Sequence, residues 1–191
     1  MSNLKVYLGL VHHPIKNKRG DVVTTSVTNL DIHDIARTCR TFGLQKYFII
    51  TPLKAQHELV NRILGHWEED KANAYNPDRQ DALSIAKLKN SIEEAILEIE
   101  DIEGQRPYLI STGANFKDND GNIEVLREKL NGLSRPAFIL FGTGWGLVDT
   151  ICEESDFKLG PIFGASQDGY NHLSVRSAAA IYCSKLMEST I

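Results

Sequence analysis

Short apolar runs alternate with longer segments of helical period along this chain. Runs of roughly 4–8 apolar residues that end at turn-forming residues are typical of buried parallel strands. The pattern predicts such strands at Val6–Val11, Tyr47–Thr51, Tyr108–Thr112, Ala137–Phe141 and, more weakly, Phe157–Ile162. Because strands alternate with helical segments, the sequence predicts an α/β fold, a mostly parallel sheet flanked by helices.

Amphipathic helices are predicted between and after these strands. Their apolar positions repeat with the helical period over Asn29–Phe42, Lys54–Trp67, Ser84–Ile102 and Leu173–Met187, whereas residues 65–79 are polar and turn-rich. For the first helix, Asn29 or Asp31 is the candidate N-cap and Gly43 the stop.

Composition narrows the class of protein. The 191 residues, 42% of them hydrophobic, fit one domain over residues 1–191, and no linker-like stretch divides them. A net charge of −4 argues against a globally basic nucleic-acid binder but leaves room for a local basic patch.

The cysteines and the N-terminus bear on location. Cys39, Cys152 and Cys183 are widely separated and form no C-x-x-C pair, so we expect reduced, mostly buried thiols and no metal site. The N-terminal residues have the wrong order of charged and apolar positions for a secretory signal, and no run approaches the roughly 18 apolar residues of a membrane span. These patterns predict a cytoplasmic protein without a membrane partner.

The strand predicted at Ala137–Phe141 ends in closely spaced glycines, Gly142, Gly144 and Gly146. Glycine tolerates positive φ and lets a ligand approach the backbone, although a tight strand-to-helix turn needs glycine for its own geometry. The spacing is G-x-G-x-G rather than the dinucleotide fingerprint, and no Walker-type phosphate loop is present. An NAD or ATP site is therefore disfavoured.

Two further segments with unusual sequence follow the glycines, GPIFGAS at 160–166 and YNHLSVRSAAA at 170–180. In open α/β sheets ligands bind outside the carboxyl ends of the strands. We therefore expect the three segments to form one site.

The ordered set FILFGTGWGL, LGPIFGAS and NHLSVRSAAAI resembles the C-terminal signature of the SPOUT superfamily of RNA methyltransferases. LDIHDIARTCRTFGLQKYFII at 30–50 is similar to the first motif of the tRNA ribose 2′-O-methyltransferase branch. The resemblance implies a SPOUT-like fold with a C-terminal trefoil knot, S-adenosylmethionine (SAM) as the cofactor, RNA as the substrate and a homodimer. Within the superfamily, the chain most resembles a group of compact single-domain members whose RNA target is not assigned.

The resemblance also implies roles for individual residues. Those that match the cofactor loops are Leu140, Gly142, Thr143, Gly144, Ile162, Gly164, Leu173, Ser174 and Val175. Arg37 matches the helix arginine of the family, which acts on the cofactor side of the partner subunit in the dimer, with Asp31 or Asp34 as its ion-pair partner. Alternatively, Arg37 only pairs with a carboxylate one helical turn away.

Departures from the family pattern leave the methylated atom open. Asp31 stands where the ribose branch has asparagine, Thr143 where it has glutamate, and His172-Leu173-Ser174 where it has Ser-Leu-Asn. The target is a ribose 2′-hydroxyl or a base nitrogen. Asp168 is a candidate base for a ring N–H, although Gln-Asp-Gly is also a common turn.

For RNA contact, the segment HHPIKNKRG at 12–20 offers Lys16, Lys18 and Arg19 to phosphates, or serves only as a solvated loop. Trp67 and Tyr75 could stack on bases or pack internally, and packing is favoured for Trp67. The leading interpretation is thus a SAM-dependent RNA methyltransferase. The alternative is a SAM-binding and RNA-binding module without catalysis.

Overall fold

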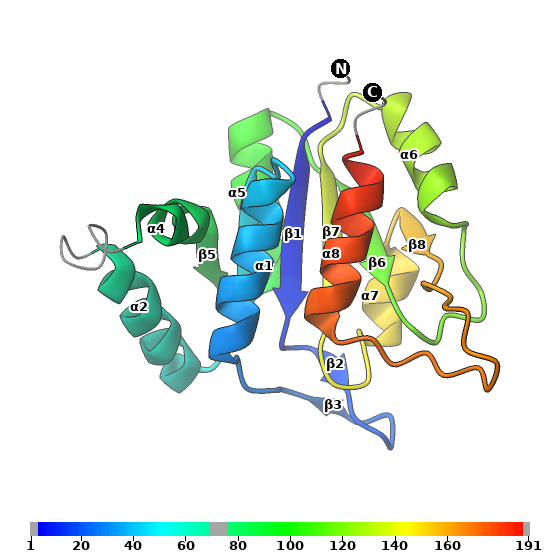
Figure 1. Cartoon of the computed structure of the whole chain (residues 1–191), viewed down its shortest axis with the longest axis horizontal. Helices are drawn as coiled ribbons and strands as arrows, with labels where there is room; N and C mark the ends of the chain where they lie inside the picture. The colour runs from blue at the N-terminus through cyan, green and yellow to red at the C-terminus, as the bar shows by residue number, and fades with distance from the viewer. Residues whose placement is uncertain (1–3, 69–75, 189–191) are drawn as a thin grey trace.

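The computed structural model describes residues 4–68 and 76–188 and contains a central sheet of six strands in the order β5-β4-β1-β7-β6-β8 (Figure 1). All neighbouring strands are parallel. The strands are β1 Val6–Val11, β4 Lys46–Ile50, β5 Ala86–Lys89, β6 Tyr108–Thr112, β7 Ala137–Gly142 and β8 Phe157–Leu159. The predicted α/β fold with a mostly parallel sheet is confirmed.

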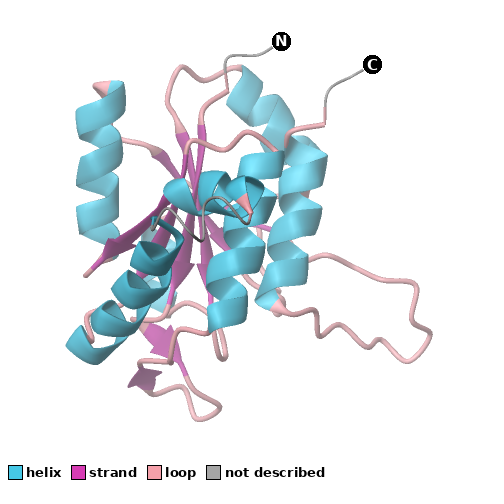
Figure 2. Ribbon diagram, turned by 60° about the vertical axis from the view of Figure 1, so that its left-hand side comes forward, coloured by secondary structure: helices cyan, strands magenta, loops and turns pink. Residues whose placement is uncertain are grey.

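Helices cover both faces of the sheet (Figures 1 and 2). The described helices are α1 Asn29–Thr41, α2 Lys54–Glu68, α4 Pro77–Ser84, α5 Ile92–Glu103, α6 Ile123–Asn131, α7 Asp149–Glu154 and α8 Val175–Leu186. Successive side chains of a strand point to opposite faces. In β1, Leu8 and Leu10 therefore join the core under α1 and α8, whereas Tyr7 and Val11 join the core under α5 and α7.

The helix predicted over Ser84–Ile102 is wrong in its first third. Residues Ala86–Lys89 instead form β5, which pairs with β4, and α5 begins only after Ser91, whose side chain accepts a hydrogen bond from the Glu94 amide. The apolar spacing of this segment fits a helix, but pairing with the free edge of β4 outweighs that local preference.

Other boundaries differ by a few residues. The N-cap of α1 is Thr28, whose Oγ1 accepts from the Asp31 amide at 3.2 Å, rather than Asn29 or Asp31. Gly43 follows the helix with φ +72°, as expected of a stop residue. β8 ends at Leu159 rather than Ile162, and the helices α4, α6 and α7 are not among the elements predicted from the sequence.

Trp67 is partly buried and packs against its neighbours, as favoured from the sequence. It lies against the core under α1, with the Arg79 guanidinium 4.9 Å from its ring centre. Tyr75 lies outside the described residues. The three cysteines are free and buried, as predicted. Among the described helices, none combines the length and the apolar character that crossing a bilayer requires.

Two excursions extend from the carboxyl end of the sheet (Figure 1). One is a small hairpin formed by β2 Ile15–Lys16 and β3 Val22–Val23, and the other is the long connection 160–174 between β8 and α8. The C-terminal trefoil knot implied by the family resemblance stays a prediction.

Candidate functional site

A cleft of about 980 Å³ opens at the carboxyl ends of β1, β6 and β7. Here the strand order reverses, because β4 and β5 lie on one side of β1 while β7, β6 and β8 lie on the other. Such a switch point is where open α/β sheets bind ligands. The volume suits a nucleoside-sized ligand, and the lining mixes apolar with polar side chains. The expected common site of the three C-terminal segments is thus present as a cavity.

The glycine loop, residues 142–147, forms one wall of this cleft. Gly144 and Gly146 have φ of +58° and +97°, and a Cβ at Gly142 would lie 2.5 Å from the Leu147 amide nitrogen. The amide of Trp145 donates to the Lys16 carbonyl, and the amide of Lys16 donates to the Gly146 carbonyl. The loop is therefore held rigidly, and glycine is required at Gly142 for the turn itself.

The start of α8 forms a second wall. Ser174 caps the helix by accepting from the Ser177 amide at 3.2 Å, and Tyr182 anchors it by donating to the Gly160 carbonyl at 2.7 Å. Because Gly160 directly follows β8, this hydrogen bond ties the start of the connection 160–174 to the interior of α8.

Most of the predicted cofactor residues meet in this cleft. Gly142, Thr143, Gly144, Ile162, Leu173 and Val175 line it. The other three do not: Leu140 is fully buried in the core under α5 and α7, while Gly164 and Ser174 are exposed.

His12 lines the same cleft, although the sequence pattern groups it with a surface segment. It directly follows β1 and is fully buried. Its Nδ1 lies 3.0 Å from Thr25 Oγ1, whereas its Nε2 has no hydrogen-bond partner among the described residues. Burial lowers the pKa of His12 to about 4, and the nearby Asp31 carboxylate opposes this shift. The only sequence signal for this residue is its place directly after an apolar strand.

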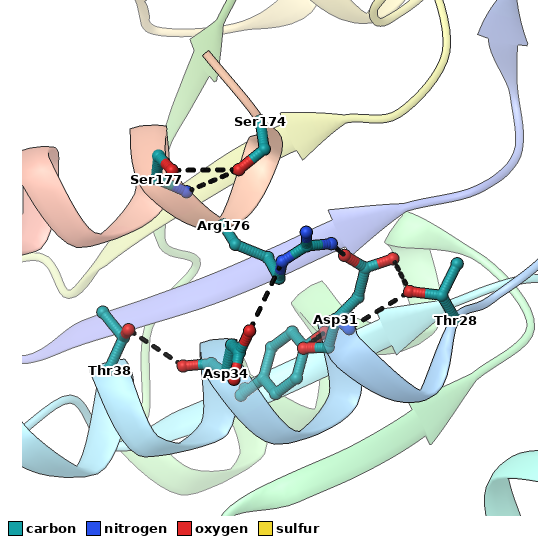
Figure 3. A network of polar contacts seen from close by, with 8 residues as sticks. Thr28, Asp31, Asp34, Thr38, Ser174, Arg176 and Ser177 are labelled. Atoms are coloured by element: carbon teal, nitrogen blue, oxygen red, sulfur yellow. Dashed lines mark hydrogen bonds and ion pairs between the residues drawn. The ribbon is translucent and has the colours of Figure 1, made fainter.

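Asp31 is part of an ion-pair network between α1 and α8 (Figure 3). Arg176 donates through Nη1 to Asp31 Oδ1 at 2.8 Å, and its Nε lies 3.4 Å from Asp34 Oδ2. Thr28 donates to the other oxygen of Asp31 at 2.6 Å. The predicted pairing of Asp31 or Asp34 with Arg37 is therefore wrong, since Arg176 takes both carboxylates.

Arg37 lies outside the cleft. Its side chain is exposed on α1 and makes no ion pair with any residue in the described part of the chain. The alternative of a simple pair with a carboxylate one turn away is also contradicted. The helical spacing permits that pair, but Arg176 competes for the same carboxylates from across the interface between α1 and α8.

Asp168 is exposed in the connection 160–174 and does not line the cleft. It accepts hydrogen bonds from the Ser166 hydroxyl and from the Tyr170 amide. These bonds lower the pKa of Asp168, so the carboxylate is stabilised in a turn, as the alternative interpretation has it.

The predicted phosphate-binding residues lie on the β2–β3 hairpin. Lys16 lines the cleft and pairs with Asp149 at 2.6 Å. Lys18 and Arg19 are exposed at the hairpin tip, within a turn in which the Asn17 side chain accepts from the Arg19 and Asp21 amides.

The cleft fits SAM in its chemistry. Its apolar wall, which includes Phe141, Leu147 and Ile162, suits an adenine ring, and the glycine loop leaves backbone groups open to a ligand. No cluster of metal-binding side chains occurs among residues 4–68 and 76–188.

Comparison with known proteins identifies the family and the fold of the chain. A family model described as SAM-dependent RNA methyltransferase matches residues 5–188. Proteins named tRNA (guanine-N(1)-)-methyltransferase from Oleidesulfovibrio alaskensis and Nitratidesulfovibrio vulgaris are 44% and 39% identical over 95% of this chain, which spans only 42% of their length. A protein of Aquifex aeolicus named only as uncharacterized is 36% identical, with 97% of this chain and 90% of that protein aligned.

Solved structures share the fold. A probable methyltransferase from Bordetella pertussis superposes with a TM-score of 0.63 at 13% identity, covering 96% of this chain and 95% of that one. The SpoU methyltransferase AviRb from Streptomyces viridochromogenes, in complex with AdoMet, gives 0.56 at 14% identity, with 98% and 60% covered. An A. aeolicus TrmH/SpoU tRNA modifying enzyme gives 0.51 at 17% identity, with 98% and 75% covered. The family model covers almost the whole chain, so the chain belongs to the SAM-dependent RNA methyltransferase family, and the solved structures show that its fold is shared.

Proposed function

We propose that this chain, as a single domain, binds SAM between the glycine loop and the start of α8 and methylates a tRNA nucleotide in the same cleft. The observation that carries this proposal is that Thr143, Ile162 and Leu173, which come from three separate motifs, line one cavity. When bound, SAM supplies an activated methyl group on a sulfonium. The protein then has to hold the RNA nucleophile in line and accept its proton.

The choice of tRNA rests on the names of the two curated relatives. More than half of each relative lies outside the match, so its guanine-N1 activity is not transferred to this chain. The methylated atom, a ribose hydroxyl or a base nitrogen, is left to product analysis. A cytoplasmic location, where such RNA is found, is part of the proposal.

A homodimer completes the site in this proposal. Arg37 is exposed on α1 and does not line the cleft of its own chain. In the family that the motifs resemble, this arginine serves the cofactor site of the partner subunit. We therefore assign Arg37 to the cleft of a second copy, where its guanidinium would bind a phosphate or the nucleophile.

The experiment is methyl transfer from labelled SAM to unmodified tRNA, followed by nucleoside analysis of the product. Arg37→Ala should reduce transfer by about 100-fold or more and leave the affinity for S-adenosylhomocysteine within about twofold. Mixing Arg37→Ala with a Gly142→Ala variant should restore activity, because one hybrid site has both an intact loop and an intact arginine.

The second candidate is a SAM-binding RNA adaptor without catalysis. It is favoured by the position of Arg37 outside the cleft in a single chain. Saturable binding of SAM and tRNA by the wild-type protein without any methylated product would establish it. Failure to bind SAM in the presence of tRNA would refute both functions.

A further inference from the structure

The hydrogen bonds around His12 have a fixed direction. Thr143 donates its hydroxyl proton to the Val11 carbonyl at 3.0 Å, and a carbonyl can only accept. In the hydrogen bond between Thr25 and Thr143, Thr25 is therefore the donor. The Thr25 oxygen is then left to accept from His12 Nδ1 at 3.0 Å. This chain of three bonds places the proton of the neutral imidazole on Nδ1 and leaves the lone pair on Nε2.

That lone pair is buried without a partner. His12 is fully buried and lines the cleft, and its Nε2 meets no donor among the described residues. Of the other buried polar side chains that line the cleft, Asp31 is held by Arg176 and Thr28, and Thr112 donates to the Leu140 carbonyl. A buried acceptor without a partner is costly to the folded protein, so it indicates a ligand that donates there.

Resting on the proposed function, we propose that His12 Nε2 accepts the hydrogen bond of the RNA hydroxyl or ring N–H that is methylated, and receives its proton. As the bond between the RNA atom and the methyl carbon forms, the carbon–sulfur bond breaks and its electron pair stays on sulfur. The proton of the nucleophile moves to Nε2, and His12 becomes an imidazolium. Asp31, the carboxylate whose charge reaches His12, stabilises that cation.

The low basicity of the buried ring suits this role. Because burial lowers the pKa of His12 to about 4, the ring is neutral near pH 7 and Nε2 stays free to accept. A hydroxyl or ring nitrogen becomes far more acidic once the methyl group has begun to bond to it. A weak base is then sufficient, and it is not already protonated before RNA binds.

The position of His12 supports RNA rather than SAM as the donor. The His12 ring is linked through Thr25 to the predicted cofactor residue Thr143, and the charge of the α1 carboxylate Asp31 acts on its pKa. In the pairing of β1 with β7, Val11 lies beside Gly142, so His12 follows β1 where the glycine loop follows β7. The nucleophile has to approach the methyl group at this boundary between cofactor and RNA.

Histidine side-chain NMR tests the tautomer without any turnover. The free protein near pH 7 should show His12 protonated on Nδ1 and bare on Nε2. Addition of tRNA together with S-adenosylhomocysteine should shift the Nε2 resonance as it accepts a hydrogen bond. S-adenosylhomocysteine alone should leave it unchanged. A proton on Nε2 in the free protein, or an equal shift with S-adenosylhomocysteine alone, would overturn the proposal.

Variants test the proton transfer. Thr25→Val removes the acceptor that fixes the tautomer and should slow methyl transfer about tenfold. Because Thr25 also donates to Thr143, the affinity for S-adenosylhomocysteine is measured alongside and should stay within about twofold. Thr24→Val is the matched control, because Thr24 lies 2.9 Å from His13 Nδ1 in the same way and neither of these residues lines the cleft. His12→Gln keeps an acceptor but cannot take a proton, and it should slow transfer about 100-fold.

The failures of the two proposals are distinguishable. If the wild-type protein methylates tRNA and the folded His12→Gln and Thr25→Val variants do so at the wild-type rate, only the role of His12 is refuted. A wild-type protein that methylates no RNA refutes the proposed function together with this role. Thermal melting of each variant shows whether a slower rate reflects unfolding, and the isosteric Thr25→Val variant remains informative if His12→Gln unfolds.

Discussion

Arg176 on α8 donates to the carboxylate of Asp31 on α1 at 2.8 Å, although the two residues are 145 positions apart. The ion pair ties the C-terminal helix, whose first turn lines the cleft, to the first helix of the chain. It also explains why Asp31 is unavailable to Arg37.

Replacing Arg176 by Met should destabilise the protein by about 2 kcal/mol, because the Asp31 side chain, only 7% exposed, is left without its cation. Arg40→Met is the matched control, since the Arg40–Asp81 pair is 52% and 56% exposed, and it should cost about 0.5 kcal/mol or less. Denaturant unfolding measures both. Adding Asp31→Asn to Arg176→Met should recover part of the loss, and strict additivity would contradict the pairing.

Stability should fall as the pH drops from 6.5 to about 4 because of His12. In this window the unfolded chain binds a proton at His12 while the folded protein, whose pKa is lowered by burial, does not. The stabilisation present above pH 6.5 is therefore lost, by at most about 3 kcal/mol. Denaturant unfolding at several pH values gives the free energy of unfolding as a function of pH. This free energy should change less steeply with pH in His12→Phe than in the wild-type protein. Identical slopes would mean that His12 titrates normally in the folded state.

Gly142→Ala should destabilise the fold by about 1–3 kcal/mol and weaken SAM binding, since its Cβ would lie 2.5 Å from the Leu147 amide nitrogen. Gly164→Ala is the control for the same change within a predicted cofactor loop. A Cβ there meets nothing within 4 Å and φ is not positive, so the melting temperature should not change. Calorimetric titration with S-adenosylhomocysteine reports the cofactor site of each variant.

Charge reversal at the hairpin tip, Lys18→Glu with Arg19→Glu, should weaken tRNA binding. The slope of the logarithm of the binding constant against the logarithm of salt concentration should become shallower by about one unit for each phosphate that the hairpin no longer binds. Lys54→Glu with Lys87→Glu, at exposed lysines on α2 and on the edge strand β5, is the matched change of charge elsewhere. Titrations of each variant with tRNA at several salt concentrations measure both the affinity and its salt dependence. Equal effects at both places would point to net charge rather than to phosphate binding by the hairpin.

The central strands were predictable because they are apolar on both faces. The bounds of β1 and β6 match their apolar runs, since buried parallel strands leave no polar alternation to confuse the pattern. β5 was not predictable, because its apolar positions also fit a helix and only pairing with β4 decides between the two.

The parts of the candidate site that consist of backbone turns could be predicted from the sequence. The ion pairs between side chains of distant segments could not. The spacing of Gly142 and Gly144 indicates a tight turn at a strand end, and the resemblance to the family predicts that this turn holds the cofactor. That Arg176 rather than Arg37 binds Asp31 depends on the packing of α8 against α1, which no local pattern encodes. The burial of His12 likewise follows from its strand being central in the sheet.

The β2–β3 hairpin shares backbone hydrogen bonds with the glycine loop, through Lys16 to Trp145 and Gly146. The surface predicted to hold phosphates and the loop predicted to hold the cofactor are thus parts of one mechanical unit. Thermodynamic linkage requires the two effects to be equal. If bound RNA changes the affinity for SAM by some factor, bound SAM changes the affinity for RNA by the same factor.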